Sequence, residues 1–68
     1  MSNQREKAAS VLVETWINGN CEDVARELLN MARAPLGGPA AIKLAIVIAV
    51  ALGAEESAKL VRLIEAAQ

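Results

Sequence analysis

The chain has 68 residues, a formal net charge of −1 and a 54% apolar composition, with Trp16 as its one aromatic residue. This length predicts a single domain over residues 1–68, which alone would bury only about 60% of the surface of its unfolded form. The small net charge excludes the strongly basic surface that binds nucleic acid or anionic lipid. One cysteine and no histidine exclude an intrachain disulfide and a conventional zinc site.

The first two predicted helices cover approximately residues 3–18 and 21–33. Gly19 is expected to end the first helix, because glycine adopts a left-handed backbone at the least cost. Asn20 is expected to cap the second helix with its side chain. Apolar residues recur at spacings of three and four in both helices. The predicted buried faces are Ala9, Leu12, Val13, Trp16 and Ile17 in the first, and Cys21, Val24, Ala25, Leu28, Met31 and Ala32 in the second.

Two further helices are predicted, over approximately residues 39–52 and 54–67. Pro39 suits the first position of a helix, and Gly53 separates the pair. In the last helix we expect an ion pair between Glu55 and Lys59, four residues apart. Its predicted inward residues are Ala58, Leu60, Val61, Ile64 and Ala67. The fold class is therefore all-α, a small four-helix bundle.

The third predicted helix is apolar on every side. Its segment AAIKLAIVIAVAL, residues 40–52, holds twelve apolar residues and one lysine. Thirteen residues span only about 20 Å as a helix, whereas the hydrocarbon core of a bilayer is about 30 Å thick. We therefore do not expect a membrane span, and the usual alternative is a central helix that the other three cover.

Three short helices with one apolar stripe each would hardly seal such a helix. In helical projection, one side of this helix carries Ile42, Ala45, Ile46, Ala49 and Leu52. Lysine marks the side nearest water, because its ammonium group avoids a dry core. The residues on that side are Lys43, Val47, Val50 and Ala54. We predict that they form the interface of a homodimer that completes the fold, with a fully intrachain core as the alternative.

The sequence offers little for catalysis. It has no histidine or tyrosine, and Cys21 is the best candidate nucleophile, at the start of a predicted helix. The adjacent Glu22 and Asp23 favour the protonated thiol, so Cys21 is better interpreted as a small, half-buried apolar residue. We expect no catalytic, cofactor-binding or metal-binding residue and no enzyme activity.

Binding to protein is the remaining class of function. Trp16 has two interpretations, since it either fills the core or, together with Ile17, anchors a partner protein at the surface. A helical DNA-associated transcriptional regulator is the alternative function. It is the weaker one, because the third helix would offer the major groove a single cation, Lys43. A short membrane-active peptide is a further alternative.

The segment WINGNCEDVARELL resembles the junction between two helices in small helical proteins encoded by bacteriophages and prophages. The matching residues are Trp16, Gly19, Asn20, Asp23, Val24, Leu28 and Leu29. The resemblance covers residues 16–29 and implies an accessory protein that binds and inhibits or redirects a host protein. The start of the sequence, MSNQREK, leads into no cleavable apolar segment, so we expect a cytoplasmic protein.

Overall fold

The computed structural model describes residues 3–35 and 37–68. Within these ranges it contains four helices and no strand, which confirms the all-α prediction. The helices are α1 (Asn3–Ile17), α2 (Cys21–Arg33), α3 (Gly38–Leu52) and α4 (Ala54–Ala67). Each end lies within one residue of its predicted position.

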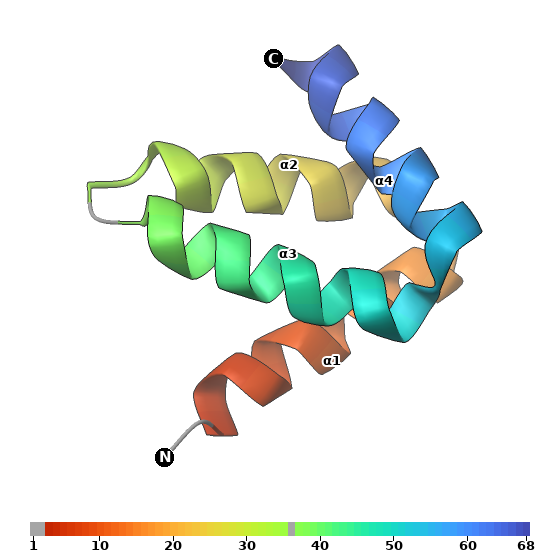
Figure 1. The fold of residues 1–68 in the computed structure, drawn as a ribbon, viewed down its shortest axis with the longest axis horizontal. Coiled ribbons are helices and arrows are strands. Elements are labelled where there is room, and N and C mark those ends of the chain that lie inside the picture. Colours follow the sequence, from red (N-terminus) through yellow and green to blue (C-terminus); the bar gives the residue numbers. More distant parts are fainter. Residues whose placement is uncertain (1–2, 36) are drawn as a thin grey trace.

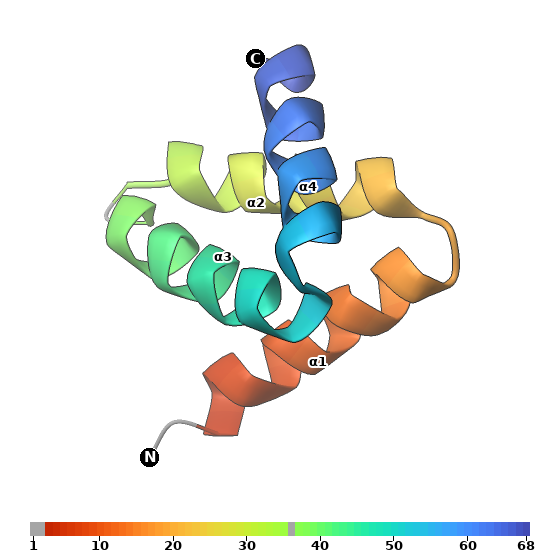
Figure 2. The same cartoon turned by 45° about the vertical axis from the view of Figure 1, so that its right-hand side comes forward.

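The helices pack around a central antiparallel pair. α2 and α3 lie side by side and run in opposite directions, while α1 and α4 cross this pair obliquely (Figures 1 and 2). α2 and α3 each contact the three other helices. The start of α1 and the end of α4 lie on opposite sides of the molecule (Figure 1). One core, shared by all four helices, therefore lies around α2 and α3.

That core is made of aliphatic side chains and one indole. Val24 and Ile48 have no exposed surface, and Leu44 is 2% exposed. Trp16 contributes the largest side chain and is 5% exposed. The buried cluster is Ala9, Leu12, Trp16, Val24, Ala25, Leu28, Leu44, Ile48 and Leu60. Since no buried polar or charged residue is found among the described ones, apolar burial accounts for the packing.

The predicted buried faces are wrong at several positions. Ile17 of α1 and Ala32 of α2 are exposed, whereas Leu29 is buried. In α4 the predicted inward residues Ala58, Val61 and Ala67 are exposed, and Leu63 packs against the core instead. These helices cross one another obliquely, so each buries only the narrow part of its apolar face that meets a neighbour.

The junction between α1 and α2 differs in part from the prediction. Gly19 has a φ of +93°, which confirms that a left-handed glycine ends α1. The amides of Gly19 and Asn20 donate to the carbonyls of Trp16 and Thr15, at 3.0 and 3.1 Å. The predicted side-chain cap is wrong, because Asn20 makes no such hydrogen bond. Its backbone carbonyl instead accepts a hydrogen bond from the amide of Asp23 at 3.2 Å.

The ion pair of Lys59 in α4 forms with a different acidic residue from the predicted one. Lys59 pairs with Glu56, three residues away, at 3.5 Å, rather than with Glu55. Both spacings bring side chains to the same face of a helix, so the sequence alone does not choose between them. The pair is largely exposed and contributes little to stability.

Gly53 joins α3 to α4 with backbone angles that only glycine adopts easily. Its φ is +91° and its ψ is 171°. The Ser57 hydroxyl lies 2.9 Å from the carbonyl oxygen of Ala49 and 2.6 Å from that of Gly53, and donates a hydrogen bond to them. Both carbonyls also accept backbone hydrogen bonds, from the amides of Gly53 and Ser57, so the side chain from α4 adds a second donor at the end of α3.

We expect Gly53→Ala to destabilise the protein by about 1–3 kcal/mol, because a Cβ atom is strained at this φ and ψ. Urea unfolding measures the loss. Gly38→Ala is the matched control, since Gly38 lies in the first turn of α3 with open space around its Cα and no positive φ. An equal loss in both variants would contradict the role of Gly53.

Candidate interaction surface

One side of α3 is covered by the other three helices. Ala41, Leu44 and Ile48 are buried, and Ala45, Ala49 and Leu52 are half-buried next to them. Successive buried residues are three or four positions apart, so they form one stripe along the helix. This stripe is the part of α3 that belongs to the core.

The opposite side of α3 is exposed although it is apolar. Val50 is 80% exposed, Ile42 63%, Ile46 58% and Val47 42%. In helical projection these four residues lie within an arc of about 140°, with Lys43 among them. We call these four residues the α3 apolar face. Large apolar side chains that cluster at a surface in this way are typical of a protein–protein contact.

The predicted dimer interface shares Val47 and Val50 with this face. Lys43, Val47, Val50 and Ala54, the predicted dimer interface, are all exposed. Ala54, however, begins α4 after the turn at Gly53 and does not continue the stripe of α3. Ile42 and Ile46 were missed, because an all-apolar helix gives no periodic signal for its outward side.

Trp16 and Ile17 do not form a surface anchor. Trp16 is buried in the core, with only 5% of its surface exposed, so its indole is not open to a partner. Ile17 is 72% exposed. The two side chains diverge because adjacent residues of a helix project about 100° apart. Trp16 is thus the core-filling residue, and Ile17 stands alone at the surface.

A hollow between α1 and α3 extends the α3 apolar face. Val47 and Ala51 line it from α3, and Ala9, Ser10 and Val13 line it from α1. Two carboxylates, those of Glu6 and Glu14, complete its lining. The hollow is therefore apolar with acidic side chains from α1.

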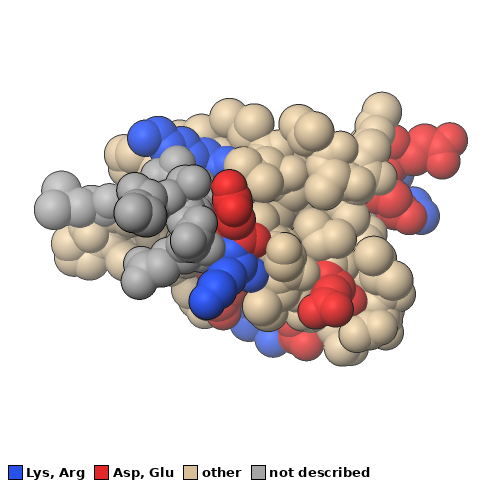
Figure 3. Space-filling model, turned by 90° about the horizontal axis from the view of Figure 1, so that it is seen from below, with Lys and Arg blue, Asp and Glu red and all other residues tan. Residues whose placement is uncertain are grey.

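Charge is scarce on α3 itself. Seen from below, acidic and basic groups lie next to one another in places, beside a broad uncharged surface (Figure 3). Lys43 is the one charged residue of α3, and it is exposed. A single cation on an otherwise apolar face does not suit a polyanion, which needs several uncompensated cations.

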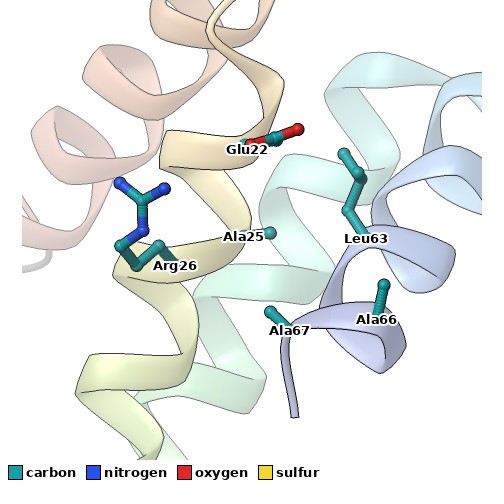
Figure 4. A pocket seen from close by; sticks show the side chains of 6 residues that line it. All are labelled: Glu22, Ala25, Arg26, Leu63, Ala66 and Ala67. Carbon is teal, nitrogen blue, oxygen red and sulfur yellow. The ribbon is translucent and has the colours of Figure 1, made fainter.

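A second pocket lies between α2 and α4, away from the α3 apolar face. Glu22, Ala25 and Arg26 line it from α2, and the side chains of Ala25 and Leu63 face each other across it (Figure 4). The Arg26 guanidinium points away from α4 in this view and pairs with Asp23 at 3.1 Å. The remaining lining consists of Ala66 and Ala67.

Cys21 is half-buried at the start of α2. Its thiol donates a weak hydrogen bond to the carbonyl of Trp16 at 3.6 Å. Within residues 3–35 and 37–68, no group of three or more histidine, cysteine or acidic residues is placed to hold a metal ion. The contacts of Cys21 are those of a residue that packs between two helices.

No family model matches the chain, and neither does any curated protein or solved structure. Among the described helices, none combines the length and the apolar character that crossing a bilayer requires.

Proposed function

We propose that the chain is a non-catalytic protein–protein interaction module that works as a homodimer, with the α3 apolar face and Lys43 in the dimer interface. The observation that carries this proposal is the exposure of four branched apolar side chains on one helix, between 42% and 80%. Burying one such side chain completely is worth about 1.5–3 kcal/mol. Burying the α3 apolar face against another chain would therefore add substantially to the free energy of unfolding, which is small in a domain of this size.

A second copy of the chain is the occupant that the face suits best. A two-fold axis brings the same patch of both subunits together, so an apolar face meets an apolar face. α3 would then have cover on both sides, the core of its own subunit on one and the second subunit on the other. This arrangement leaves the outer surfaces of α2 and α4 open to a further protein.

We propose a target protein in a host cell as that further partner, which the module inhibits or redirects. The support is the resemblance of residues 16–29 to small helical phage and prophage proteins. That segment contains the end of α1 and the first part of α2. Its exposed residues belong to α1, α2 and the turn between them and not to α3, so this proposal gives dimerisation and target binding different elements.

The dimer is tested by light scattering after size exclusion, together with thermal unfolding over a hundredfold range of protein concentration. We expect the mass of a dimer and a melting temperature that rises with concentration, because association stabilises the folded state by mass action. A monomer mass at every concentration, with a constant melting temperature, would overturn the proposal.

A further inference from the structure

The α3 apolar face alone is too small for a stable dimer. A helix of 15 residues is about 22 Å long and about 10 Å wide, so one side of it offers only a few hundred Å². A standard interface buries about 800 Å² per partner. That area would be about a sixth of the 4794 Å² surface of this chain. The second copy must therefore also contact a helix next to α3, and the hollow between α1 and α3 continues the apolar surface in that direction.

The charges around this surface are arranged unequally along α3. Lys43 lies in the amino-terminal half of the helix. Glu14 lines the hollow together with Val47 and Ala51, which belong to the carboxyl-terminal half. Glu55 is exposed in the first turn of α4, directly after Gly53. Lys43 thus lies toward one end of α3, and acidic side chains lie near the other end.

We infer that two copies pair with their α3 helices antiparallel, so that Lys43 of each copy meets the acidic end of the other, where Glu14 and Glu55 lie. This inference rests on the proposed function and specifies its geometry. The α3 apolar face is centred near Ile46 and Val47. Complete overlap of two antiparallel faces therefore places Lys43 opposite Val50 of the second copy, one residue before Ala51. Ala51 lines the same hollow as Glu14.

The parallel arrangement lacks this complementarity. It would place Lys43 of one copy next to Lys43 of the other, and the acidic residues of the two copies next to each other. Like charges at close range repel, whereas the antiparallel pair makes the same favourable contact twice. The two arrangements bury similar apolar groups, so the charges decide between them.

Two complementary variants test the orientation. One carries Lys43→Glu, and the other carries Glu14→Lys together with Glu55→Lys. In an antiparallel homodimer of either variant, residue 43 of each copy meets residues of the same charge at positions 14 and 55 of the other copy. We therefore expect the dissociation constant of each variant to rise about tenfold at low salt. A 1:1 mixture of the two should form a heterodimer of wild-type affinity, because opposite charges meet again at both ends. Arg62→Glu, an exposed charge reversal on α4, is the control and should dimerise normally.

Analytical ultracentrifugation of each variant and of the mixture gives the result. A wild-type dimer whose two variants both associate normally would overturn the antiparallel orientation and leave the proposed dimer intact. Variants that fail to associate alone and also fail in the mixture would overturn the orientation as well. A wild-type chain that stays monomeric would instead overturn the proposed function itself.

Discussion

Replacing Val50 by lysine should dissociate the dimer. Val50 is 80% exposed in the single chain, so the substitution disturbs no intrachain packing. In the dimer the new ammonium group would replace an apolar contact and would face Lys43 of the second copy, and an uncompensated buried charge costs about 3–5 kcal/mol. The dissociation constant should then rise at least about a hundredfold, which light scattering after size exclusion measures directly.

Val61→Lys is the matched control for this prediction. Val61 is also an exposed valine, 54% exposed, but it lies on α4 outside the α3 apolar face. Its substitution should leave the dissociation constant unchanged. If both variants dissociate the dimer equally, the interface is not specific to α3. If Val50→Lys remains a dimer of unchanged affinity, the α3 apolar face lies outside the interface.

The ends of the helices could be predicted because local residues determine them. Gly19 and Gly53 have positive φ angles, and Pro39 lies in the first turn of α3. These effects act within a few residues, so they can be read from the sequence without knowing the neighbouring helices. The capping role of Asn20 is the exception, because several hydrogen-bond arrangements are open to such a turn.

The buried faces could be predicted only in part, because they depend on how the helices cross. Trp16 and Ile17 are equally apolar in sequence, yet the first is in the core and the second is exposed. In α4 the apolar positions form a broad face, and the crossing with α2 and α3 selects Leu60 with Leu63 rather than Val61. Periodicity shows that a helix has an apolar side but does not fix which part of it meets a neighbour.

The candidate interface shows the same limit within one helix. The position of Lys43 correctly predicted which side of α3 is exposed, and Val47 and Val50 lie on that side. Ile42 and Ile46 could not be found in this way, since every other direction around α3 is apolar as well. Only the positions of α1, α2 and α4 distinguish the covered side from the exposed one.

Ile48 and Ile46 therefore make a matched pair for measuring how much of α3 its own chain covers. Ile48 has no exposed surface, and Ile46, two residues earlier, is 58% exposed. Ile48→Ala leaves a cavity among the buried residues and should destabilise each subunit by about 2–5 kcal/mol. In a domain of this size, that loss is enough to unfold much of the population.

Ile46→Ala removes the same atoms from the other side of the helix, and its effect should depend on concentration. At dilutions where the protein is monomeric, urea unfolding should differ from wild type by less than about 0.5 kcal/mol, because the side chain is already largely in water. At high concentration the variant should be clearly less stable than wild type, because it loses apolar contact in the dimer and so gains less from association. Equal losses for Ile46→Ala and Ile48→Ala in the dilute monomer would mean that the three other helices cover α3 on both sides, which leaves no free face for a second chain.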